Sequence, residues 1–158
     1  MSQHTVENTQ VEMTQVVMPQ YTNVVGTVFG GQIMSWLDIC AAVSAQRHAR
    51  MPVVTASIDS VNFIQPVKQG QVVILKSQVN AVFHSSMEVG VTVLAEDPLT
   101  GKRVKACRAF CTFVALDMKG CPVKKLPELS LSSATDKRRA REALERRKVR
   151  LKNRSHKS

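Results

Sequence analysis

The chain lacks the cysteine patterns that mark a disulfide framework or a zinc site. Its four cysteines, at positions 40, 107, 111 and 121, include no Cys-x-x-Cys pair, and its four histidines have no ligand spacing to them. A chain of 158 residues can bury an adequate hydrophobic core without such covalent or metallic support. These absences argue against a zinc site and a disulfide framework, and they favour a reducing compartment.

Long hydrophobic runs are also absent. The longest apolar stretch is interrupted by Asp38, so the sequence predicts no membrane span. The first ten residues are polar and lack the apolar segment of a secretory signal peptide. Together these features predict a cytoplasmic protein.

Acidic residues are scarce in the last part of the chain, so its charge is uneven. Residues 124–158 hold 13 Lys/Arg and 4 Asp/Glu, whereas the formal net charge of the whole chain is +10. The preceding 123 residues are therefore close to neutral. We expect a folded body over residues 1–129 and a basic C-terminal tail over 130–158, either helical or disordered, that could attract phosphates or an acidic surface. A helix from about Lys137 to Leu151 would be capped by Thr135 or Asp136.

The stretch NVVGTVFGGQIMSWLDICAA, residues 23–42, joins a glycine-bearing turn to an apolar segment. It predicts a helix from about Gly30 to His48 with almost no polar face, which other elements should wrap. Asp38 lies inside this helix, where a carboxylate is costly unless it is paired or used. The structural alternative is that Asp38 caps a turn or pairs with Arg47 or Arg50.

Alternating apolar and polar residues predict the strands. A first strand precedes the helix at residues 11–18, and the others follow at about 53–64, 71–83, 86–96 and 103–116. The alternation changes phase near Asp59–Ser60, which predicts a β-bulge. Consecutive strands with short turns pair antiparallel. The predicted class is α+β, with one long buried helix wrapped by a curved antiparallel sheet of about five strands.

Several of these segments carry a resemblance in order and at the expected intervals. Residues 23–38 resemble the signature of the hotdog-fold acyl-CoA thioesterases, and more specifically of the bacterial and brain-type acyl-CoA hydrolases. The pieces VVTASID, FIQPVKQG, SSMEV and FVALD, which begin at positions 53, 63, 85 and 113, are similar to later motifs of that group. The resemblance covers about residues 10–129. It implies a hotdog fold, hydrolysis of acyl-CoA to a free carboxylic acid and coenzyme A, no cofactor, and a homodimer that assembles as a trimer of dimers, a homohexamer.

The start of the helix has the chemistry of an oxyanion site. Gly30 and Gly31 leave backbone N–H groups unpaired at the positive end of the helix dipole, where a thioester carbonyl could approach. Asp38 faces the same side as Gly31 but lies about 10.5 Å farther along the axis. One carbonyl carbon cannot reach both in one chain, so the spacing predicts a composite site across a two-fold dimer.

The resemblance implies that Asp38 acts as general base or as nucleophile, and that Asn23 orients the water or holds the carbonyl oxygen. By itself Asn23 is equally well explained as a turn residue. The resemblance also places the phosphates of coenzyme A near the turn that contains His84, where the family often has Arg or Lys. A neutral His binds phosphate more weakly, and Arg108 or the basic tail could substitute. The candidate substrate-binding residues are Gly30, Thr55, Ser57, His84, Ser85, Ser86 and Arg108, and no metal ligand is expected.

Two other functions fit parts of the sequence. Gly30-Gly31-Gln32 is the tripeptide of release factors that hydrolyse peptidyl-tRNA, but here it opens an apolar helix and not an exposed loop, so a nucleic-acid partner is not expected. A non-catalytic hotdog domain that binds acyl-CoA as a sensor is the second alternative. The presence of both Asn23 and Asp38 favours catalysis, and the absence of Gly-x-Ser-x-Gly argues against a serine hydrolase.

Overall fold

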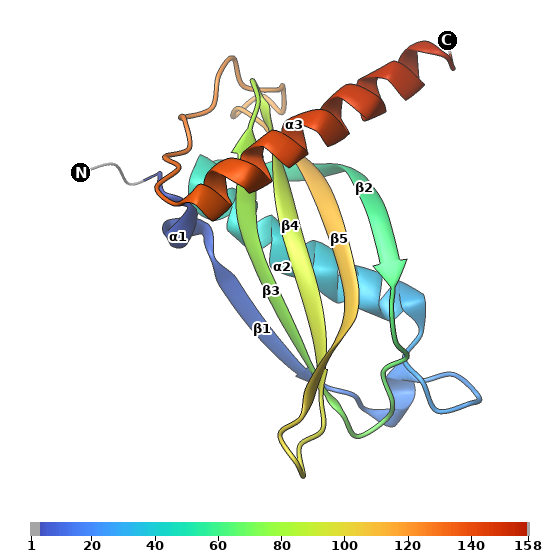
Figure 1. Ribbon diagram of the computed structural model, residues 1–158. Coiled ribbons are helices and arrows are strands. Elements are labelled where there is room, and N and C mark those ends of the chain that lie inside the picture. Colours follow the sequence, from blue (N-terminus) through green and yellow to red (C-terminus); the bar gives the residue numbers. More distant parts are fainter. Residues whose placement is uncertain (1–3, 158) are drawn as a thin grey trace.

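A long helix lies on each face of a curved, five-stranded antiparallel sheet in the computed structural model of the chain (Figure 1), which describes residues 4–157. The elements in chain order are α1 (Val6–Thr9), β1 (Val11–Val16), η1 (Pro19–Tyr21), α2 (Gly30–Ala49), β2 (Val53–Phe63), β3 (Val72–Val82), β4 (Ser86–Glu96), β5 (Arg103–Ala115) and α3 (Ala134–Ser155). The α+β class, the central helix and all five strands are confirmed within a few residues. The short helices α1 and η1 were not predicted.

The strands are arranged in the order β1-β3-β4-β5-β2, and all neighbours in the sheet are antiparallel. The expectation that each consecutive pair of strands is adjacent is wrong for β2 and β3. Strand β1 occupies the edge of β3, pairing Val11 with Ser77 through Val16 with Val72. Strand β2 therefore lies at the opposite edge against β5, and the segment between β2 and β3 crosses the end of the sheet.

Strand β2 contains two register shifts against β5. One lies between Asp59 and Asn62, where Ser60 has a φ of 54°. It confirms the predicted bulge near Asp59–Ser60. The other lies between Thr55 and Ser57 and was not predicted. Because side chains alternate between faces along a strand, each shift changes the face to which the following residues point.

Helix α2 packs on the inner face of the sheet, defined here as the face opposite α3. Its buried residues are Ile33, Trp36, Leu37, Cys40, Ala41, Ser44, Ala45, His48 and Ala49. The other side of the helix is open: Gly31, Ser35 and Ile39 are exposed and Asp38 is half-buried. The predicted helix wrapped by a curved sheet is confirmed; within the single chain the sheet covers one side of α2 and leaves the other side open.

Helix α3 lies across the outer face of the sheet, in front of β3, β4 and β5 (Figure 1). It is capped by Ser133, whose Oγ accepts from the N–H of Asp136, while the Asp136 carboxylate accepts from the N–H of Ser133. The predicted cap at Thr135 or Asp136 is therefore wrong by two or three residues, although Asp136 takes part in this capping box. The helix is also longer than predicted. The division of the chain at residue 129 stays a prediction.

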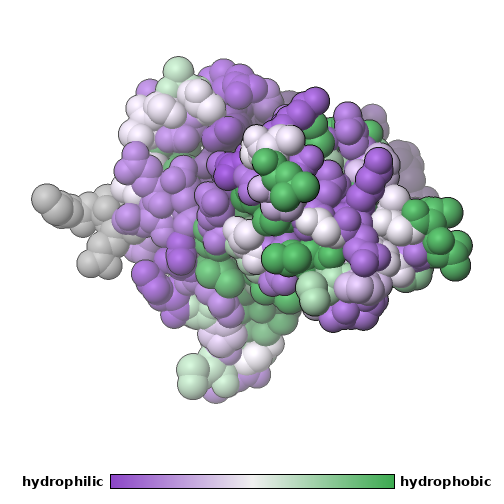
Figure 2. All heavy atoms as spheres, turned by 90° about the horizontal axis from the view of Figure 1, so that it is seen from below, coloured by the Kyte–Doolittle hydropathy of each residue, from purple (hydrophilic) through white to green (hydrophobic). Residues whose placement is uncertain are grey.

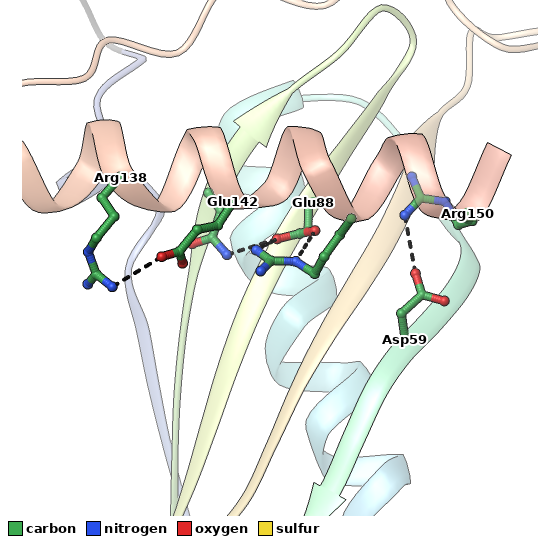
Figure 3. A network of polar contacts seen from close by, with 7 residues as sticks. Asp59, Glu88, Arg138, Glu142 and Arg150 are labelled. Carbon is green, nitrogen blue, oxygen red and sulfur yellow. Dashed lines mark hydrogen bonds and ion pairs between the residues drawn. The ribbon is translucent and has the colours of Figure 1, made fainter. Parts of the chain in front are cut away.

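Two ion pairs connect α3 to the sheet (Figure 3). Arg146 donates from Nε and Nη2 to both carboxylate oxygens of Glu88, at 3.0 and 2.7 Å, and Arg150 donates to Asp59 Oδ2 at 3.2 Å. Glu88 is only 1 % exposed, on the sheet face that α3 covers. The Arg146 guanidinium also stacks on Phe110, 3.6 Å from the ring centroid. Of the two predicted alternatives for the tail, helical or disordered, the structure shows the helical one, and the helix is packed on the sheet.

We expect the substitution Arg146→Met to destabilise the protein by about 3 kcal/mol, because it leaves the buried Glu88 carboxylate without its cation. Arg138→Met is the matched control, since the exposed Arg138–Glu142 pair is expected to contribute less than about 1 kcal/mol. Urea unfolding of both variants measures the difference. Equal loss of stability in the two variants would show that the buried pair does not hold α3 in place.

Candidate active site

The only carboxylate on α2 lies on the open side of that helix. Asp38 Oδ1 accepts a hydrogen bond of 2.7 Å from Thr55 Oγ1 on β2. Within residues 4–157 Asp38 makes no ion pair, so the alternative of a pair with Arg47 or Arg50 is wrong; Arg47 instead donates to the carbonyl of Gln10. A half-buried carboxylate with one oxygen held by a hydroxyl has its other oxygen available for a ligand or a water.

The N-terminus of α2 is open at Gly31. The N-cap residue Phe29 makes no side-chain cap, so the first N–H groups of the helix have no side-chain acceptor there. A Cβ added at Gly31 would meet nothing within 4 Å, whereas one at Gly30 would contact the Phe63 ring at 3.4 Å. The single chain therefore does not need glycine at position 31 for packing. A bare backbone at this position suits the close approach of a ligand.

Asn23 is a turn residue in the single chain. Its Oδ1 accepts from the N–H groups of Val25 and Thr27, both at 3.1 Å, and its Nδ2 donates to Thr27 Oγ1 at 2.9 Å. The same loop exposes the side chains of Val24 and Val25 almost completely. Figure 2, which views the molecule from the end where this loop lies, shows apolar atoms gathered in patches among hydrophilic ones. The catalytic role of Asn23 stays a prediction.

Ser57 and Arg108 lie on the outer face of the sheet, away from Asp38. Ser57 is opposite Thr112, and its Oγ donates to Asp59 Oδ2 at 3.3 Å. The register shift after Thr55 is the cause, because it turns Ser57 to the other face from Thr55. Arg108 stacks on Phe110 on the outer face, with the guanidinium 5.0 Å from the ring centroid. Of the strand residues predicted for the site, the structure brings only Thr55 to Asp38.

The turn at His84, Ser85 and Ser86 lies at the other end of the sheet from the Asn23 loop (Figure 1). The Ser85 carbonyl accepts from Ala115 N–H at 3.0 Å, next to the start of β2. Helix α3 places the Arg147 guanidinium 4.9 Å from the ring centroid of Phe83, beside this turn. In the sequence Arg147 is marked only by the run Arg146-Arg147-Lys148, and its position beside Phe83 depends on the docking of α3.

Burial keeps three of the thiols protonated. Burial, together with the negative charges of Asp38, Glu88 and Asp59, raises the pKa of Cys111 to about 12. Burial also raises the pKa of Cys40 and of Cys107. Among the described residues, no group of three His, Cys, Asp or Glu side chains could hold a metal ion. None of the helices in residues 4–157 combines the length and the hydrophobicity needed to cross a bilayer.

Comparison with known proteins finds similarity to thioesterases and acyl-CoA hydrolases. The family model of the Thioesterase superfamily matches residues 25–102. An uncharacterized acyl-CoA thioester hydrolase of Bacillus subtilis is 48% identical over 117 residues, which cover 74% of this chain and 68% of that protein. The acyl-CoA hydrolase of Staphylococcus aureus, solved with butyryl coenzyme A and coenzyme A, is 35% identical with a TM-score of 0.87, covering 97% of this chain and 94% of that one. A hexameric acyl-CoA thioesterase is 38% identical with a TM-score of 0.89, covering 94% of each chain.

The mammalian relatives are much longer than this chain. Mouse acyl-coenzyme A thioesterase 11 is 41% identical over 143 residues, which cover 90% of this chain but 24% of that protein. The chain therefore spans about a quarter of the length of that relative.

We expect only Cys121 to react with a thiol reagent at pH 8 in the native protein. It is the one exposed thiol of the four, and a thiol whose pKa is about 12, as for Cys111, carries almost no thiolate at that pH. A colorimetric disulfide exchange assay should count one thiol in native protein and four after denaturation. The variant Cys121→Ser should give none in the native state. Reaction of two or more native thiols would contradict the burial of the other three.

Proposed function

Because the chain belongs to the hotdog-fold acyl-CoA thioesterases, a family of thioester hydrolases, we propose that it hydrolyses acyl-CoA to a free carboxylic acid and coenzyme A. The observation that carries this proposal is the half-buried Asp38 carboxylate on the open side of α2, held by Thr55 at 2.7 Å. Hydrolysis of a thioester needs a base that activates water and donors that stabilise the oxyanion. On the open side of α2, Asp38 can serve as the base, and the backbone N–H groups of Gly30 and Gly31 at the start of the helix can serve as the donors.

In this mechanism Asp38 removes a proton from a water, which attacks the carbonyl carbon of the thioester. Thr55 Oγ1 donates to Oδ1 and fixes the plane of the carboxylate, so that Oδ2 faces the water. The tetrahedral intermediate puts a negative charge on the former carbonyl oxygen, which the N–H groups of Gly30 and Gly31 stabilise. The C–S bond then breaks, and coenzyme A leaves as its thiolate and takes up a proton. Direct attack by Asp38, through an anhydride that water opens, gives the same products.

The distance along α2 makes the site composite. Asp38 lies about 10.5 Å from Gly31 along the helix axis. In a two-fold dimer, Asp38 of one protomer would face Asn23 and Gly31 of the other. The open side of α2, with Gly31, Ser35 and Ile39 exposed, is the surface that such a partner would cover. The hexameric relatives support a trimer of such dimers.

Variants of the Staphylococcus aureus enzyme support the choice of residues. Structures of that enzyme exist in which an asparagine, an aspartate or a threonine is replaced by alanine, and the intervals between the three positions are 15 and 17 residues. The intervals between Asn23, Asp38 and Thr55 are the same. A site that depends on these three residues is therefore the one we propose here. Ser57 lies on the other face of the sheet and would act on it only indirectly.

Two further properties belong to the proposal. The reaction needs no cofactor, because carboxylate, hydroxyl and backbone groups supply the base and the oxyanion donors. We place the protein in the cytoplasm, since a rat relative that is 33% identical over 142 residues is a cytosolic acyl coenzyme A thioester hydrolase. The chain spans 37% of the length of that relative.

We expect Asp38→Asn to lower kcat by roughly 10²–10⁴-fold, the usual contribution of a general base. The amide keeps the shape of the side chain and can still accept from Thr55, so the melting temperature should change little. Glu145→Gln, a carboxylate-to-amide change on the exposed side of α3, is the control and should keep full activity. Release of thiol from butyryl-CoA measures the rate. Activity of the Asp38 variant within threefold of wild type would remove Asp38 from the mechanism. If the wild-type protein binds butyryl-CoA but does not hydrolyse it, the alternative of a non-catalytic acyl-CoA sensor is favoured.

Mixed dimers test the shared site. Asn23→Ala and Asp38→Asn subunits should each be nearly inactive alone, but a mixture that exchanges chains should regain activity. In a mixed dimer one site carries both substitutions and the other carries neither, so up to about half of the dimers contribute one intact site. Differently tagged subunits report the exchange. If exchange is complete and the mixture stays as inactive as its parents, both residues belong to a site within one chain.

A further inference from the structure

The outer face of the sheet contains a cavity of about 570 Å³ beside the N-terminal half of α3. Its walls come from β1, β3, β4, β5 and α3, and they include Lys76, Gln78, Asn80, Arg108, Phe110 and Arg139. Asp38 lies on the inner face, so this cavity is separated from the proposed catalytic carboxylate of the same chain by the sheet. The cavity is large enough for a phosphorylated small molecule.

Two guanidinium groups in this cavity have no carboxylate partner. Within residues 4–157, neither Arg108 nor Arg139 forms an ion pair. Other arginines of α3 differ: Arg138, Arg146 and Arg150 each bind a carboxylate (Figure 3). The acid on the rim, Glu12, is 4.0 Å from Lys76, and both side chains are about half exposed. The cavity therefore has an excess of positive charge.

The buried carboxylate of Glu88 does not neutralise Arg108 or Arg139, because it is already bound by other side chains. Glu88 is the buried acid closest in structure to this region, but both its oxygens are bound by Arg146, and Asn80 Nδ2 donates to one of them at 3.1 Å. Phe110 holds the Arg108 guanidinium by stacking, which limits its freedom before any ligand binds. An arginine that is held in place loses less entropy when it binds an anion.

The floor of the cavity is polar and closely fitted. Asn80 is buried, and a Cβ at Gly90 would come within 2.7 Å of its Nδ2, so only glycine at position 90 leaves room for that side chain. The Nε2 atom of Gln78 is buried and donates to no acceptor among the described residues. A buried donor without an acceptor is costly, and Gln78 belongs to the wall of this cavity.

We propose that this cavity binds a phosphate-bearing anion, with Arg108 and Arg139 as its main contacts. Phosphate oxygens match the paired N–H donors of a guanidinium, and such charge-assisted hydrogen bonds are among the strongest in proteins. The phosphate can come from a free phosphorylated small molecule or from the nucleotide end of an acyl-CoA bound by a neighbouring protomer. The second source rests on the function proposed above, and the first does not.

Calorimetric titration with inorganic pyrophosphate tests the site directly on the full-length protein. The double variant Arg108→Ala/Arg139→Ala should bind about tenfold or more weakly than wild type, since two charge-assisted contacts are lost. Lys105→Ala/Arg141→Ala removes the same charge from β5 and α3 without touching the cavity, and should bind within twofold of wild type. Equal weakening in both double variants would reduce the effect to net charge and overturn the site. Wild-type protein that shows no saturable binding would overturn it as well.

Two measurements distinguish the sources of the phosphate. If the site holds the nucleotide end of the substrate, the Arg108/Arg139 double variant should raise KM for butyryl-CoA but not for butyryl-pantetheine, which lacks the nucleotide. Coenzyme A should then displace pyrophosphate. If the ligand is a free molecule, both KM values should stay unchanged and pyrophosphate should still bind at saturating coenzyme A. Wild type that binds pyrophosphate but hydrolyses neither thioester would refute the proposed function and leave the anion site standing.

Discussion

The packing of α2 on one face of the sheet is the constraint from which the rest of the structure follows. The helix buries one side, from Ile33 to Ala49, against β3, β4 and β5, and this burial supplies much of the core. The sheet cannot reach the other side. That side presents Gly31 and Asp38 to whatever lies outside the single chain. A carboxylate on a helix of this hydrophobicity is tolerable because the side it occupies is open and because Thr55 donates to it.

A second helix divides the outer face of the sheet into a covered part and an open part. Under α3, the Glu88 carboxylate is buried and bound by Arg146. The helix is therefore held to the sheet by an ion pair whose acid is shielded from water. Next to it lies the cavity lined by Arg108 and Arg139, neither of which forms an ion pair within residues 4–157. The basic C-terminal segment therefore combines arginines that fix α3 to the sheet with Arg139, which forms no ion pair within residues 4–157.

The two faces of the sheet thus have different chemistry. One register shift in β2 decides on which face Thr55 and Ser57 lie. Thr55 reaches Asp38 on the inner face, whereas Ser57, two residues later, joins Asp59 and Arg150 on the outer face. In a regular strand the two residues would share a face. The register shift between them places the Thr55 hydroxyl against Asp38 on one face and the Ser57 hydroxyl against Asp59, the acid bound by Arg150 of α3, on the other.

The local sequence was enough to determine α2, the five strands and the position of Gly31 and Asp38 on one helix. The span of α2, the five strands and the bulge near Asp59 follow from periodicity, glycine and proline, which act over a few residues. The separation of Gly31 and Asp38 follows from helix geometry alone. Only the tertiary structure decided that β2 pairs with β5, that Arg108 and Ser57 lie on the outer face, and that α3 docks through Arg146 and Glu88. These outcomes depend on contacts between segments dozens of residues apart and on a one-residue shift that reverses a face. The alternation within a single strand does not contain that information.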